Sequence, residues 1–177
     1  MIYNNADILL CSGTSEISKQ IKAFTDSIYS HVGLIFNANV NGQRKTFVIE
    51  AIQPRVAIIP IEQYFNNYQQ SGKAYPGELY LGRYQGGLTL SEVDKIFQSA
   101  INTVGLEYDT ASIIRQAFNK VFGAGLQDKD HHRLICSELV GCAYASAGIN
   151  LQKDKHSFYT PASIGRDNQI IISKLKG

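Results

Sequence analysis

An Asn41-Gly42 pair lies between two apolar, β-rich segments, and it constrains the fold more than any other feature of this sequence. Asn-Gly is the strongest short-range signal for a two-residue β-hairpin, because both residues tolerate the positive φ angles that the turn requires. With these two residues as the turn, Val40 pairs with Gln43 and the register of the hairpin follows. We therefore expect an antiparallel hairpin built from the segments on either side.

This register brings two polar residues together. It sets Glu50 opposite Gly33 and His31 opposite Ile52, so that Glu50 and His31 are diagonal neighbours on one face. Such neighbours lie roughly 7–8 Å apart, which lets a carboxylate reach an imidazole. Glu50 is also the one charge in the apolar segment FVIEAI (47–52). A slip of one residue would put the two side chains on opposite faces, so their pairing depends on the register.

The remaining pattern predicts an α+β fold, with an antiparallel sheet packed against helices. A Thr-x-x-Glu capping box at Thr89 opens a helix that we expect Gly105 to end. The first expected helix carries an apolar stripe of Ile17, Ile21 and Phe24. The expected strands cover residues 7–10, 31–36, 46–52, 55–59, 78–84 and 170–175, and the expected helices cover residues 14–24, 62–70, 89–104, 110–122 and 135–147.

Composition limits the classes of protein. The chain has 177 residues, 44% of them hydrophobic and 18% charged, which suits a single domain over residues 1–177. A net charge of +2 argues against a dedicated nucleic-acid binder. No apolar run approaches the roughly 20 residues of a transmembrane helix. The start MIYNNADILL lacks the pattern of a secretory signal, so we expect the cytoplasm.

Three cysteines do not form a disulfide framework, and Cys136 is the most informative of them. It stands at the start of the helix expected over residues 135–147, where partial positive charge and free N–H groups favour a thiolate and stabilise an oxyanion. The alternative is a buried structural cysteine. A nucleophile also needs a base. His31 opens an apolar strand, whereas His131, His132 and His156 lie in polar segments typical of a solvated surface. Cys136 and His31, with an acid to orient the imidazole, are the residue types of a nucleophilic triad.

Six short motifs occur in an order that resembles a known family. They are ADILL (6–10), SHVGLI (30–35), VIEA (48–51), GLEYD (105–109), ICSELV (135–140) and YTPASI (159–164). Their succession resembles the YiiX/YebB-like group, the circularly permuted branch of the NlpC-type papain-like cysteine peptidases. In the unpermuted family the cysteine segment precedes the histidine strand, and here the order is reversed. The family motif often begins Gly-Asp, where this chain has Ala6-Asp7.

The resemblance implies a permuted papain-like fold, a bacterial or phage source and a cysteine hydrolase. That enzyme would cleave an amide bond of a small peptide or lipid-amide substrate, with no metal or other cofactor. The resemblance also implies Cys136 as the nucleophile at a helix N-terminus, His31 as the base, Glu50 as the third polar residue and Tyr108 as a site-lining group that can donate to the oxyanion. Tyr144 follows on the same helix, and we expect it in the core.

Other functions stay open. An acyltransferase would use the same residues, and a catalytically silent binding module would use the same cleft. A metal site built from His131, His132 and Cys136 does not have the usual ligand spacing. The Lys153 and Lys155 cluster is short, and a solvated surface explains it. The insert over residues 118–132 carries apolar residues that could cap an acyl pocket or pack in the core.

Overall fold

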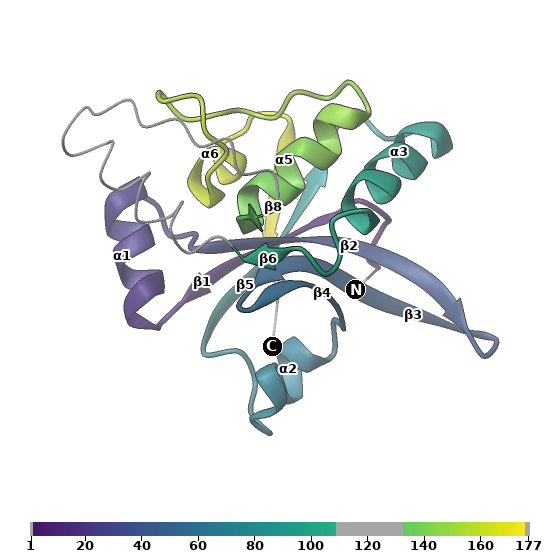
Figure 1. The fold of residues 1–177 in the computed structure, drawn as a ribbon, viewed down its shortest axis with the longest axis horizontal. Coiled ribbons are helices and arrows are strands. Elements are labelled where there is room, and N and C mark those ends of the chain that lie inside the picture. The colour runs from purple at the N-terminus through teal and green to yellow at the C-terminus, as the bar shows by residue number, and fades with distance from the viewer. Residues whose placement is uncertain (1, 109–132, 176–177) are drawn as a thin grey trace.

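The computed structural model describes residues 2–108 and 133–175 of the chain, and an open eight-stranded sheet organises them in the order β7-β6-β4-β3-β2-β1-β5-β8 (Figure 1). The strands are β1 Ile8–Gly13, β2 His31–Val40, β3 Gln43–Ile52, β4 Arg55–Pro60, β5 Gly77–Tyr84, β6 Glu107–Tyr108, β7 Arg133–Leu134 and β8 Ile170–Lys174. Within these ranges every neighbouring pair is antiparallel except the short β6–β7 pair. The expected α+β class with an antiparallel sheet is thus confirmed.

Helices cover both faces of the sheet. They are α1 Glu16–Thr25, α2 Gln63–Asn66, η1 Tyr68–Gln70 (a 3-10 helix), α3 Leu90–Ile101, α5 Cys136–Ser146 and α6 Pro161–Gly165. Figure 1 shows α3, α5 and α6 on one face, α2 on the other and α1 at one end of the sheet beside β1. No helix among the described residues is long and apolar enough to cross a membrane.

The sheet separates two apolar clusters. In β1, Ile8 and Leu10 pack into the cluster on the side of α3 and α5, whereas Leu9 and Cys11 pack into the cluster that includes Tyr64 of α2. This alternation follows from the two-residue period of a strand, which sends successive side chains to opposite faces. The central strands are therefore apolar on both faces.

The Asn41-Gly42 hairpin forms with the predicted register. Both turn residues have positive φ angles, 53° and 78°. Val40 pairs with Gln43, and the ladder continues without a bulge as far as Leu34 opposite Ile49. The turn at one end of the hairpin therefore determines which residues of β2 and β3 lie opposite each other at the other end, where His31 and Glu50 lie.

The helix that begins at the Thr89 capping box is shorter than expected. The box forms, since the Thr89 side chain accepts from the Glu92 backbone and Glu92 accepts from that of Thr89. The helix ends at Ile101 rather than at Val104. A tighter turn follows, in which the Val104 N–H bonds to the carbonyl of Ile101, three residues back. Gly105, with a φ of 92°, comes only after this turn.

Two other expected helices differ from the sequence pattern. No residue of α1 is buried, and Ile17 is 55% exposed, so its apolar stripe does not join the core. The helix expected over residues 62–70 divides into α2 and η1 at Asn67, whose φ is −152°. The Asn67 side chain accepts from the Gly72 backbone, and the Tyr68 N–H bonds to the Lys73 carbonyl, so the chain turns back there. The helix expected over residues 110–122 lies outside the described residues.

Candidate active site

Cys136 is the first residue of α5. The residue before it, Ile135, has an extended backbone and no side-chain oxygen with which to cap the helix. The Ile135 N–H donates to the Glu138 carboxylate at 3.4 Å. Cys136 is buried, with 5% of its surface exposed. The first turn of α5 therefore presents backbone N–H groups at the position of this thiol, as a helix N-terminus does.

His31 and Glu50 meet as the hairpin register requires. The His31 Nε2 atom lies 2.5 Å from Glu50 Oε2. The side chain of Glu50 is 1% exposed and that of His31 is 13% exposed, so the pair is nearly closed to solvent. Gly33 leaves room for it, because a Cβ atom there would lie 3.3 Å from the Glu50 Cβ atom and 2.5 Å from Val48 Cγ1.

Tyr64 holds the same carboxylate from the other side. Its hydroxyl donates to Glu50 Oε2 at 2.6 Å, and Tyr64 is 1% exposed. Burial, followed by the charge of Glu50, raises the pKa of Tyr64, so the hydroxyl keeps its proton and remains a donor. The sequence pattern did not identify this residue. Its place under β3 depends on how the segment after β4 folds back, and no local signal reports that.

His31 also contacts Cys136. Burial alone would lower the pKa of His31. The charge of Cys136, hydrogen bonding to Cys136 and Glu50, and the charge of Glu50 outweigh burial and raise the pKa to about 10. The imidazole can therefore hold a proton at neutral pH. The structure thus brings the three residues into one chain of contacts, although β2 and α5 are far apart in sequence.

The other two cysteines have different surroundings. Cys11 is fully buried, and burial together with the charge of Glu50 raises its pKa well above the usual value. Cys142 is exposed on α5. All three cysteines are free. A fully buried thiol and an exposed thiol are useful internal references for the reactivity of Cys136.

Tyr108 lines a cavity that also contains His31. The cavity volume is about 410 Å³, within the range of small-molecule sites. Its walls come from α1, the turn after β3, the segment from η1 to Pro76, and β6. Tyr108 is half-buried and its backbone N–H bonds to the carbonyl of Pro54, which fixes β6 beside the turn. The residue that the motif comparison singled out therefore lies at the same site as His31.

The remaining candidates lie elsewhere. Tyr144 is fully buried and donates to the carbonyl of Ala6 at 2.6 Å, which is the expected core role. Ala6 has a φ of 67°, which is the conformation that favours a glycine and accounts for the Gly-Asp form of the motif. His156 is exposed, as its polar segment predicted. His131 and His132 lie outside the described residues.

Comparison with known proteins places the chain in a family. The model of the permuted papain-like amidase enzymes, YaeF/YiiX, C92 family, matches residues 3–160. The chain belongs to this family. It is also 28% identical over 141 residues to the uncharacterized protein YiiX of Escherichia coli strain K12. That match covers 80% of this chain and 57% of YiiX, so the chain spans little more than half the length of this relative.

A solved structure shares the fold. The crystal structure of metalloprotein yiiX from Escherichia coli O157:H7 superposes with a TM-score of 0.69 and 21% identity, covering 96% of each chain. That protein is described as a metalloprotein. Among residues 2–108 and 133–175 of the present chain, no three His, Cys, Asp or Glu side chains gather closely enough to hold a metal ion.

Proposed function

We propose that this protein is a cysteine hydrolase that cleaves an amide bond through an acyl-enzyme on Cys136. His31 is the base and Glu50 orients it. The observation that supports this most strongly is the contact of one buried imidazole with both a thiol at a helix N-terminus and a carboxylate. Membership of a papain-like amidase family supports the same reaction class.

The chemistry follows from these contacts. The Cys136 thiolate attacks the carbonyl carbon, and a bond forms between Sγ and that carbon. The C–N bond then breaks, and the amine leaves with the proton of the His31 imidazolium. Water next attacks the thioester and gives a proton to His31. The C–S bond breaks, the acid leaves, and the thiolate and the imidazolium are restored.

Charge that develops on the carbonyl oxygen needs donors. The backbone N–H groups of the first turn of α5 can supply them beside Cys136, and the helix dipole favours negative charge there. We propose Tyr108 as a further donor, because it lines the cavity that contains His31. Glu50 bonds to the Nε2 atom of the imidazole and thereby directs the other ring nitrogen at the thiol, as the acid of a triad does. The sequence predicts a small peptide or lipid amide as substrate and the cytoplasm as its compartment.

An acyl-trapping experiment tests the nucleophile. Wild type and the Cys136→Ala, His31→Ala and Cys142→Ala variants are incubated with p-nitrophenyl acetate, an activated ester, and the acetylated residue is mapped by mass spectrometry. We expect wild type and Cys142→Ala to acetylate Cys136 and release p-nitrophenolate, and Cys136→Ala and His31→Ala to react about 10³-fold more slowly. Neutral p-nitroanilides then test amide cleavage. Equal turnover by Cys136→Ala, or acetyl on Cys142 alone, would contradict the proposal and leave a binding module on the same fold.

A further inference from the structure

The cavity beside His31 has a distinctive lining. Its apolar surface includes six large side chains, two on α1, one at the end of β3, two in the segment between α2 and β5, and one on β6. They are Ile17, Ile21, Ile52, Tyr68, Tyr75 and Tyr108. Burial raises the pKa values of Tyr68 and Tyr75, so both rings stay neutral. Such a surface favours an apolar group.

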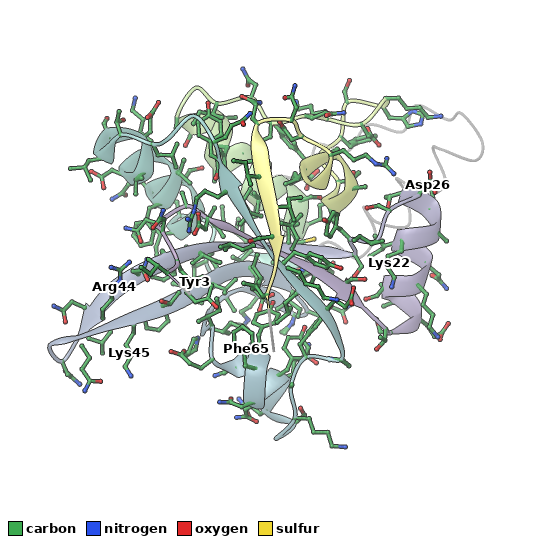
Figure 2. All side chains as sticks on the ribbon, turned by 180° about the vertical axis from the view of Figure 1, so that it is seen from behind. Tyr3, Lys22, Asp26, Arg44, Lys45 and Phe65 are labelled. Atoms are coloured by element: carbon green, nitrogen blue, oxygen red, sulfur yellow. The ribbon has the colours of Figure 1, made fainter. Side chains whose placement is uncertain are left out.

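The described lining of the same cavity carries little charge. Among the described residues that line it, His31 is the only side chain that carries a charge at neutral pH, and the polar ones are serine, threonine and glutamine. The charged residues of α1 are engaged elsewhere. Glu16 and Lys19 pair with each other at 2.6 Å. Lys22 of α1 and Asp26, which follows the helix, are both labelled in Figure 2 and line a separate groove.

These two features determine what the cavity can accept. An apolar group gains by leaving water for this surface. A charged group would lose its hydration, and among the described lining residues only His31 carries a charge that could compensate that loss. An ammonium group would also lie close to the His31 imidazolium, whose positive charge repels it. A carboxylate would compete with Glu50 and Cys136 for the same imidazole.

We propose that this cavity binds an uncharged, apolar group of the substrate, next to the bond that Cys136 attacks, and that it discriminates against substrates charged at that position. This inference rests on the proposed function and deepens it. The group can be the chain of a fatty acyl amide or the side chain of an apolar amino acid, because the two share the chemistry that the lining selects.

Alkylation of Cys136 by a matched set of chloroacetamides tests the cavity without a known substrate. In each reaction Sγ displaces chloride and forms a thioether. The set is N-hexyl, N-benzyl, N-(5-aminopentyl) and N-(4-carboxybutyl) chloroacetamide. Rates at Cys136 are followed by peptide mass spectrometry and divided by the rates with N-acetylcysteine. We expect the two neutral probes to react about tenfold faster than the two charged ones. A faster hexyl probe favours an alkyl chain and a faster benzyl probe an aromatic side chain, and both support the inference. Equal normalised rates for all four probes would overturn it.

A charge introduced into the lining tests the location. Ile17 is 55% exposed, so Ile17→Glu leaves the core intact. Its control is Ile171→Glu on β8, at the far edge of the sheet, where the isoleucine is 59% exposed and does not line the cavity. Ile17→Glu should raise the normalised rate of the aminopentyl probe about threefold or more, by pairing with its ammonium group, and lower that of the carboxybutyl probe. Ile171→Glu should change neither. If Ile17→Glu leaves the normalised rates of the aminopentyl and carboxybutyl probes unchanged, the apolar group does not bind in this cavity.

Iodoacetamide separates this inference from the proposed function. This small neutral reagent reports the reactivity of the thiol and does not need the apolar lining. If Cys136 of wild type reacts with it no faster than Cys142, the proposed function fails, and the role assigned to the cavity fails with it. If Cys136 reacts much faster than Cys142 but the chloroacetamides show no preference, only the cavity assignment fails.

Discussion

Tyr64→Phe tests whether the buried hydroxyl stabilises the Glu50–His31 pair. The substitution keeps the ring, whose centroid lies 5.1 Å from that of Tyr68 and 5.6 Å from that of Tyr75, and removes only the donor to Glu50. A hydrogen bond to a charged group is worth about 1.5–3 kcal/mol, and its loss leaves a buried acceptor with one partner fewer. In a domain of this size about 1 kcal/mol corresponds to about 2–4 °C, so we expect Tm to fall by about 3–12 °C.

Tyr80→Phe is the matched control. The Tyr80 hydroxyl donates to Glu78 at 2.6 Å, the same distance as in the Tyr64–Glu50 bond, but that bond is exposed to solvent. Water replaces an exposed partner, so we expect Tyr80→Phe to lower the free energy of unfolding by less than about 0.5 kcal/mol. Urea unfolding at neutral pH and differential scanning calorimetry measure both variants. If Tyr64→Phe lowers the free energy of unfolding no more than Tyr80→Phe does, the buried Tyr64 hydroxyl does not stabilise the Glu50–His31 pair.

Three further predictions concern stability. Gly33→Ala should lower the free energy of unfolding by about 1–3 kcal/mol in urea, because its Cβ atom would lie 2.5 Å from Val48 Cγ1, and an unchanged midpoint would contradict this packing. Thr89→Ala should cost about 1 kcal/mol through loss of the α3 cap, whereas Thr89→Ser should recover most of it, and equal losses would contradict a capping role. The raised pKa of His31, about 10, stabilises the folded state fully below its unfolded pKa, and this stability is lost as the pH rises through 10. The stability difference between wild type and His31→Gln, measured by urea unfolding, should therefore shrink from about pH 6.5 to pH 10, and a constant difference would contradict the shift.

Local signals predicted the part of the site that one hairpin contains. The Asn41-Gly42 turn sets the register of β2 and β3, and that register alone places His31 and Glu50 on one face. The capping box at Thr89 likewise predicted where α3 begins. Both features depend on residues close in sequence, whose geometry the backbone determines before any tertiary packing.

The rest of the site depends on contacts between distant segments. The approach of Cys136 to His31 requires α5 to pack on the sheet, and the order of the motifs indicated it only through the family resemblance. Tyr64 was missed because its position depends on how the segment after β4 folds back against the sheet, and its hydrogen bond to Glu50 leaves no signal in the local sequence. The apolar stripe of Ile17, Ile21 and Phe24 predicted a helix but not its surroundings, because only the fold places α1 at the end of the sheet, where Ile17 and Ile21 line a cavity.

The most direct test of the Cys136–His31 pair is a pH series of alkylation by iodoacetamide, followed for each cysteine by mass spectrometry in wild type and in His31→Ala. We predict that at about pH 6 Cys136 of wild type reacts far faster than Cys11 and Cys142, and that His31→Ala removes the difference. Reactivity of Cys136 equal to that of Cys142, or unchanged in His31→Ala, would contradict the pair and the hydrolase built on it.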